Sequence, residues 1–169
     1  MFANDIIRVK GHLLIKVLDA KSGRELDRVD KPNLVCKNSK VAITQLLAQR
    51  PADNPSYDKM WAIYVGDSNT APTTDQIALQ GTVVAKKAVD QPIEIISPSD
   101  SGIIEVEMTL LSGEANGSTL REAALYTRGD NDDPTSTSGA LMLARQVHAD
   151  VTKTSGIVLS YTWRYQITV

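Results

Sequence analysis

Hydrophobic and polar side chains alternate most regularly over residues 157–169. The apolar and aromatic positions there are Ile157, Leu159, Tyr161, Trp163, Tyr165, Ile167 and Val169. Because a period of two places successive side chains on opposite faces of a β-strand, this stretch predicts one long strand with one buried face. We expect Leu159, Tyr161, Trp163, Tyr165 and Ile167 to form part of the structural core.

The same alternation, interrupted by turn residues, predicts further strands along most of the chain. We expect them at residues 12–18, 24–29, 34–36, 60–65, 82–89, 91–96, 104–110, 120–127 and 140–148. From residue 39 to residue 50 the apolar period changes to about 3.6, and Pro51 follows, which predicts one helix. Turn signals at short intervals between about nine strands are typical of a β-sandwich or flattened barrel, here with one helix near residues 39–50.

A chain of 169 residues predicts a single domain. Residues 1–11 have a weak pattern and are expected to form an N-terminal arm, with one β-sandwich domain over residues 12–169. The net charge of -2 shows no basic excess of the kind that nucleic-acid binding requires. No apolar stretch has the length of a secretion signal or a membrane span, so neither is expected.

The residues that most often carry chemistry are few and scattered. His12 and His148 are the two histidines, and with Cys36 as the single cysteine they do not form a zinc-ligand spacing. Glu105 and Glu107 project from the same face of an expected strand, at a spacing compatible with the two carboxylates of a glycoside hydrolase. A solvated strand face produces the same spacing, and we prefer that interpretation. Cys36 lies in a short apolar strand and is expected to be a buried thiol.

The longest polar loop, residues 129–139, contains Asp130, Asp132 and Asp133. These carboxylates suggest calcium, but the glycine and the terminal glutamate of an EF-hand loop are missing, so no metal is predicted. Residues 129–138 of this loop, ten residues without apolar periodicity, are long for a hairpin connection, which suggests an assembly loop. Since residues 66–68 also lack the glycine pattern of a nucleophile elbow, we expect a strand-ending turn there. We therefore expect no catalytic residue, no cofactor and no enzymatic activity.

Three stretches together resemble bacteriophage tail-fibre and tail-collar proteins. They are Trp61–Ser68 followed by Ala71-Pro72-Thr73 and Ile77–Leu79; Ser118–Tyr126, which contains Leu-Arg-Glu-Ala-Ala-Leu-Tyr; and Ala140–Arg145 with Lys153-Thr154 before the last strand. The first is similar to the family's "VG-D/G, A-P-T, leucine" segment. The second is similar to its "IREAGLY" strand, and the third to its "LFAR … KT" ending. The resemblance covers residues 60–169.

The resemblance implies a mainly β structural protein of a tailed-phage virion, assembled in the host cytoplasm as a homo-oligomer in contact with other virion proteins. Tail fibres of this kind usually continue into a long shaft, whereas this sequence ends at Val169. We therefore expect a collar, neck, tail or baseplate component, with no direct contact to nucleic acid or membrane. The alternative is a carbohydrate- or receptor-binding module of a tail fibre.

Overall fold

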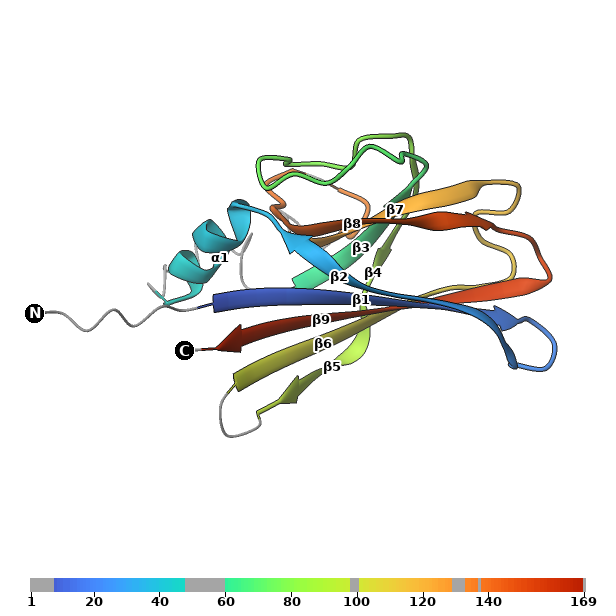
Figure 1. Ribbon diagram of the computed structural model, residues 1–169, viewed down its shortest axis with the longest axis horizontal. Helices are drawn as coiled ribbons and strands as arrows, with labels where there is room; N and C mark the ends of the chain where they lie inside the picture. The colour runs from blue at the N-terminus through green and yellow to red at the C-terminus, as the bar shows by residue number, and fades with distance from the viewer. Residues whose placement is uncertain (1–7, 48–59, 98–100, 129–132, 137, 169) are drawn as a thin grey trace, which may run out of the picture.

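The computed structural model describes residues 8–47, 60–97, 101–128, 133–136 and 138–168. It confirms the mainly β prediction: nine antiparallel strands form a curled half-barrel sheet, accompanied by a single helix in the part described (Figure 1). The elements are β1 (Arg8–Asp19), β2 (Glu25–Val35), α1 (Asn38–Leu47), β3 (Met60–Gly66), β4 (Val83–Ala88), β5 (Asp90–Ile96), β6 (Ser101–Leu110), β7 (Thr119–Thr127), β8 (Met142–Thr152) and β9 (Ile157–Thr168).

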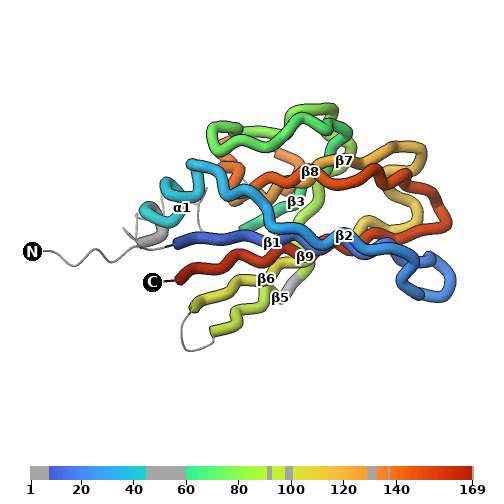
Figure 2. Tube along the Cα trace, viewed as in Figure 1, coloured from blue at the N-terminus to red at the C-terminus, as the bar shows by residue number. Residues whose placement is uncertain are grey.

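The strands form one sheet in the order β4-β3-β7-β8-β2-β1-β9-β6-β5. Strand β2 joins its two halves, because it pairs with β1 along most of its length and with β8 only at Leu34 and Val35. Only Val89 separates β4 from β5, which pair with β3 and β6 at the two ends of the sheet. The sheet therefore curls back on itself, with β3, β7 and β8 packed over β1, β9 and β6 (Figure 2).

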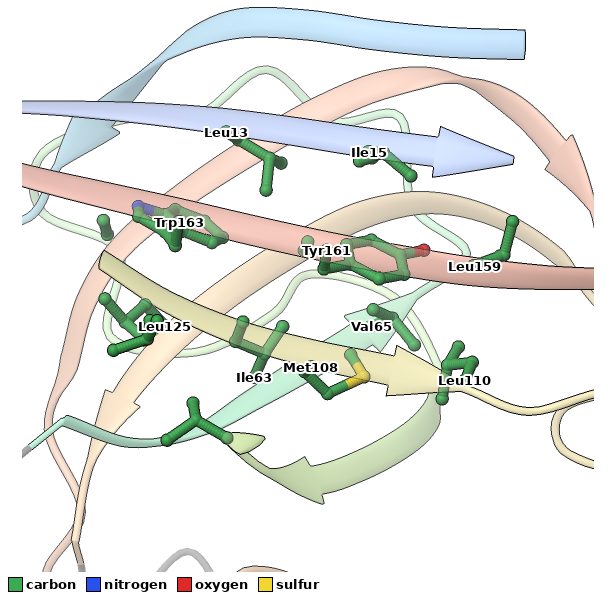
Figure 3. Close-up of a cluster of buried hydrophobic side chains, with 14 of the residues drawn as sticks. Leu13, Ile15, Ile63, Val65, Met108, Leu110, Leu125, Leu159, Tyr161 and Trp163 are labelled. Atoms are coloured by element: carbon green, nitrogen blue, oxygen red, sulfur yellow. The ribbon is translucent and has the colours of Figure 1, made fainter. Parts of the chain in front are cut away.

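The main core lies between these two halves, and β9 runs through its centre (Figure 3). Cross-strand pairing with β1 and β6 sets three buried rows side by side: Leu13, Trp163 and Val106; Ile15, Tyr161 and Met108; and Val17, Leu159 and Leu110. Ile63, Val65 and Leu125 face these rows from the other half. Of the five predicted core positions, Leu159, Tyr161, Trp163 and Tyr165 are buried, and Ile167 is partly buried against them.

The helix begins within one residue of the predicted start. In its first turn, the Ser39 hydroxyl donates to the carbonyl oxygen of Leu143 at 2.7 Å. This bond ties α1 to β8, and Ala42 is buried against the main core. Residues 48–50 of the predicted helix lie outside the described residues.

Two strand boundaries differ from the predictions for physical reasons. Residues 8–11, which were assigned to an arm, belong to β1, because they pair with the end of β9. Gly11 interrupts the alternation of apolar and polar residues, so the sequence pattern does not reveal this part of the strand. A Cβ at Gly11 would lie 2.1 Å from the side chain of Asn33, which crosses over the glycine. Strand β2 continues through Pro32, where a break was expected. A proline is tolerated there since β2 is changing partners and has an edge without ladder pairing.

Candidate functional site

Two charged side chains are completely buried against each other on neighbouring strands. Glu122 of β7 and Arg145 of β8 are diagonal neighbours in the ladder and lie on the face turned away from the main core. The Nε of Arg145 donates to Oε2 of Glu122 at 2.7 Å, and Nη2 lies 2.6 Å from the same oxygen. A charge taken out of water is costly unless it is paired and hydrogen-bonded, so each side chain requires the other.

Glu122 also binds the loop of residues 67–82 that joins β3 to β4. Its carboxylate accepts the backbone N–H of Gly81 at 2.8 Å and that of Gln80 at 3.1 Å. Gly66 leaves room for this carboxylate, because a Cβ there would lie 2.7 Å from Oε1 of Glu122. The end of the loop is therefore fixed by a carboxylate that also neutralises Arg145.

Arg145 binds the other part of the same loop. Its Nη1 donates to the carbonyl oxygen of Thr70 at 3.0 Å and to Oε1 of Gln76 at 2.9 Å. The same Gln76 oxygen accepts the N–H of Thr73 at 3.0 Å, which folds the loop around its own Ala71–Gln76 segment. A single buried ion pair thus holds the loop at four points, two through each partner.

Asp67 joins the two ends of this loop. It lies in the turn that the sequence predicts at the end of a strand. Oδ1 of Asp67 accepts the N–H of Thr82 at 2.7 Å, so the two ends of the loop meet. Arg121 donates to the Asp67 carbonyl oxygen at 3.3 Å and makes a bidentate pair with Asp150 at 3.0 and 2.9 Å. Asp67 therefore shapes a turn, which is its expected role.

The loop covers a second, smaller apolar cluster on the outer face of β3, β7 and β8. The cluster contains Cys36, Ala62, Tyr64, Ala124, Tyr126 and Met142, with Leu79 of the loop packed against it. The rings of Tyr64 and Tyr126 stack at a centroid distance of 4.3 Å. Burial raises the pKa of the Cys36 thiol to about 11, so the thiolate is scarce at neutral pH.

Part of the predicted assembly loop is docked on the same face. The hydroxyl of Tyr64 donates to the carbonyl oxygen of Ser136 at 3.0 Å, and Nζ of Lys86 donates to that of Thr135 at 3.0 Å. Asp133 accepts the N–H of Thr135 at 2.8 Å and its hydroxyl at 2.7 Å, which makes a local turn. The other two carboxylates of this loop, Asp130 and Asp132, lie outside the described residues.

A third loop, residues 111–118, is held by lysine side chains. Lys153 is fully buried, and its Nζ donates to the Thr154 carbonyl oxygen at 2.9 Å and to Oδ1 of Asn116 at 3.3 Å. Burial lowers the pKa of Lys153, an effect that Glu114 partly opposes. Glu114 is also bound by Lys87 of β4 at 2.9 Å. The three long connections are therefore all fastened to the sheet by charged or phenolic side chains.

The two histidines lie in different environments. His12 is partly exposed on β1 and pairs with Asp30 at 3.0 Å between Nε2 and the carboxylate. His148 is buried on β8 and lies edge-on to Tyr161, with ring centroids 6.4 Å apart. Burial lowers the pKa of His148, although a hydrogen bond with the Ala149 carbonyl oxygen opposes this. His148 is thus a core residue.

The two glutamates of β6 each bind a residue of the neighbouring strand β9. Glu105 faces Arg164 of β9 and forms an ion pair with it, and Glu107 accepts the hydroxyl of Thr162 at 3.1 Å. Such pairs are typical of a solvated strand face. Among the residues that the structure describes, no group of three or more histidine, cysteine, aspartate or glutamate side chains is arranged to hold a metal ion.

A cleft of about 600 Å³ opens where β1 begins and β2 leaves it. Its polar lining comes from Lys10, His12, Asn33, Arg164 and Gln166, and its apolar lining from Val9, Pro32, Leu34, Val35 and Ile103. The side-chain amide atoms of Asn33 are buried there without a hydrogen-bond partner. The cleft therefore combines cationic groups, aliphatic surface and an unsatisfied amide.

The predictions from the sequence missed Glu122, Arg145 and Lys153. The sequence contained a signal for two of them. Glu122 interrupts the apolar strand Leu-Arg-Glu-Ala-Ala-Leu-Tyr, and Arg145 ends the apolar stretch Leu-Met-Leu-Ala-Arg. A charge inside a buried strand needs a partner. The identity of that partner depends on the register of β7 with β8, which no local pattern reveals.

Comparison with known proteins identifies no relative: no family model matches the chain, and no curated protein or solved structure shows significant similarity to it. The one helix in the described part of the chain is too short to cross a membrane.

Proposed function

We propose that this protein is a structural component of a tailed-bacteriophage virion, placed at the collar, neck, tail or baseplate. It acts by oligomeric assembly and by contacts with other virion proteins. Its mechanism is the burial of surface at these interfaces, not the catalysis of a reaction. One observation carries the proposal, namely that the three stretches resembling phage tail proteins meet in a single network.

Each stretch contributes a defined part of that network. The first supplies Asp67, which closes the loop of residues 67–82, the second supplies Glu122, and the third supplies Arg145. The loop residues that the pair binds, Thr70, Gln76, Gln80 and Gly81, lie between or directly after the motifs of the first stretch. These residues are far apart in the sequence but hold one another in the fold. On this proposal, the resembling motifs are present because together they hold one surface loop in a fixed conformation.

A rigid loop suits assembly. Ile77 lies next to the anchored Gln76 and is 70% exposed, so the network presents an apolar side chain to solvent on a fixed backbone. Ordering a flexible loop at an interface costs conformational entropy, and a loop that is already held avoids most of that cost. The anchoring therefore supports a function in binding other proteins.

Antibody labelling of intact phage particles, viewed by electron microscopy, tests the proposal directly. We expect labels at one position along the neck or tail of each particle. An antibody against a capsid protein serves as the control for particle integrity. Particles that carry the capsid label but lack the label for this protein would contradict the virion assignment.

The cleft at the start of β1 favours a second candidate, a carbohydrate-binding module of a tail fibre. Its cationic lining and aliphatic walls suit an acidic sugar, whose carboxylate and apolar face they can contact. Titration of labelled protein with uronic-acid oligosaccharides, followed by NMR, tests it. Shifts confined to Lys10, Asn33 and Arg164 would support this candidate, and unchanged spectra would refute it.

A further inference from the structure

Four strands have an edge that is unpaired over most or all of its described length. They are β2 and β8, which pair with each other only through Leu34 with Arg145 and Val35 with Ala144, and the two end strands β4 and β5 (Figure 1). An unpaired edge presents backbone N–H and C=O groups that can accept another strand. The side chains on each edge decide whether it does so.

The edge of β2 is protected by charge. Residues 25–31 include Glu25, Asp27, Arg28, Asp30 and Lys31, all exposed. Asp27 and Lys31 lie opposite Val17 and Leu13, so they point to the core side of the sheet. Inward-pointing charges of this kind oppose edge-to-edge pairing.

The edge of β4 carries two lysines that are already engaged. Nζ of Lys86 donates to the carbonyl oxygen of Thr135, and Nζ of Lys87 donates to that of Thr109 and to Glu114. These bonds fasten two loops beside β4. Another strand could pair there only after these contacts were broken.

The edge of β5 carries neither inward-pointing charges nor engaged lysines, and its one proline, Pro92, precedes the exposed isoleucines. Ile95 is 75% exposed and Ile96 is 40% exposed, while Ile93 packs partly against the core. Glu94 is the one charged residue between Ile93 and Ser97. Ile95 and Ile96 lie opposite Ile104 and Ile103 of β6, so an apolar pair stands on each face of the sheet at this edge.

We propose that β5 pairs with β5 of a second copy of this chain, antiparallel, about a two-fold axis at Ile95. This register places Ile95 opposite itself and Glu94 opposite Ile96, so that no like charges face each other. A two-fold axis at Glu94 would set two carboxylates directly opposite, which is destabilising. The segment is therefore self-complementary in one register, as an isologous dimer interface requires.

This inference rests on the proposed function in assembly and names the surface and the partner that assembly uses. Backbone groups of alternate β5 residues point away from β6 and supply the new ladder, while the isoleucines supply the apolar contact. Pairing joins the two curled sheets edge to edge without rearranging either core. The dimer then forms a unit from which a larger assembly can be built.

The test compares the oligomeric state of purified protein variants by sedimentation velocity over a wide concentration range. The parent protein should dimerise reversibly. Ile95→Lys places two cations opposite each other and should raise the dimer Kd by at least about tenfold. Leu26→Lys, the same change at a position 47% exposed on the charged β2 edge, should dimerise like the parent.

A second pair of variants tests the register. Ile96→Lys places each new ammonium group opposite Glu94 of the other copy, so the dimer should persist. Ile95→Cys should form an intermolecular disulfide on mild oxidation, whereas Glu94→Cys should not, because its diagonal separation of about 7–8 Å exceeds disulfide reach. Near-ultraviolet circular dichroism identical to that of the parent shows that each variant is folded.

Several outcomes would overturn the inference. These are a parent protein that stays monomeric at all concentrations, undiminished dimerisation of Ile95→Lys, loss of the dimer in Leu26→Lys or Ile96→Lys, or a cysteine cross-link at residue 94 in place of residue 95. A protein that labels phage particles yet remains monomeric would overturn the β5 interface alone. A dimer that is absent from particles would overturn the virion assignment alone.

Discussion

Replacing Arg145 by methionine should destabilise the fold more than any surface substitution. Methionine retains most of the side-chain length but removes the charge, so the carboxylate of Glu122 stays buried with only the N–H groups of Gln80 and Gly81 as donors. The contacts of Arg145 with Thr70 and Gln76 are lost as well. The change therefore leaves an uncompensated buried charge and frees one side of the loop of residues 67–82.

The complete burial of both charges determines how much unfolding free energy should be lost. Removing one partner of a fully buried ion pair costs about 3–5 kcal/mol, a large share of the roughly 5–15 kcal/mol that stabilises a typical domain. Glu122→Gln should cost a similar amount, because it strands the guanidinium instead. The double variant removes both charges, so its cost should fall below the sum of the single costs by about 1–3 kcal/mol.

Urea unfolding at pH 7, followed by tryptophan fluorescence, measures these free energies of unfolding. Arg121→Met is the matched control, because it breaks the partly exposed pair with Asp150 and should cost less than about 1 kcal/mol. In Arg145→Met the amides of Gln80 and Gly81 should also exchange hydrogen faster. An Arg145→Met protein as stable as the parent, or a control that loses as much, would refute the assigned role of the pair.

Three further predictions concern the core. Trp163→Ala removes a fully buried indole and should lower the unfolding free energy by about 3–5 kcal/mol in the same urea assay; a loss below 1 kcal/mol would contradict its central place. Burial lowers the pKa of His148 below the unfolded value of about 6.5, so the unfolded state binds a proton first as pH falls. The unfolding free energy should therefore decline below pH 6.5, and His148→Gln should flatten that slope; equal slopes in both proteins would exclude His148 as the cause. Cys36, with a pKa of about 11, should stay unmodified by iodoacetamide in the native protein at pH 8 and react after unfolding, as judged by mass spectrometry.

Strands with one buried face were predictable from the sequence. The alternation in β9 predicts its position within a residue, because its inward side chains meet the core, whereas its outward ones, apart from the buried Thr162, are partly or fully exposed. Strand β2 was cut short at Pro32, since local patterns do not show that a strand changes partners at that point. The joining of β4 to the far end of the sheet through Val89 has no local signature either.

The candidate site was predictable only in its pieces. The motif residues of the three stretches were recognised separately, but the meeting of Glu122 with Arg145 depends on ladder register and on a loop that folds back over the strands. The sequence assigns Asp133 to an assembly loop, which stays a prediction, but it gives no sign that Thr135 and Ser136 of the same loop are bonded to β4 and β3, respectively. These are long-range contacts, and a one-dimensional pattern contains no information about them.

The central position of β9 has a consequence for synthesis on the ribosome. This strand separates β1 from β6, and it is the last of the nine strands to leave the exit tunnel. Until it emerges, β1 and β6 each present an unpaired apolar strand edge, and the core rows of Trp163, Tyr161 and Leu159 are missing. Folding of this sheet therefore waits until β9 has emerged, and it is slow because the ladder between β9 and β1 joins segments that lie far apart in the sequence.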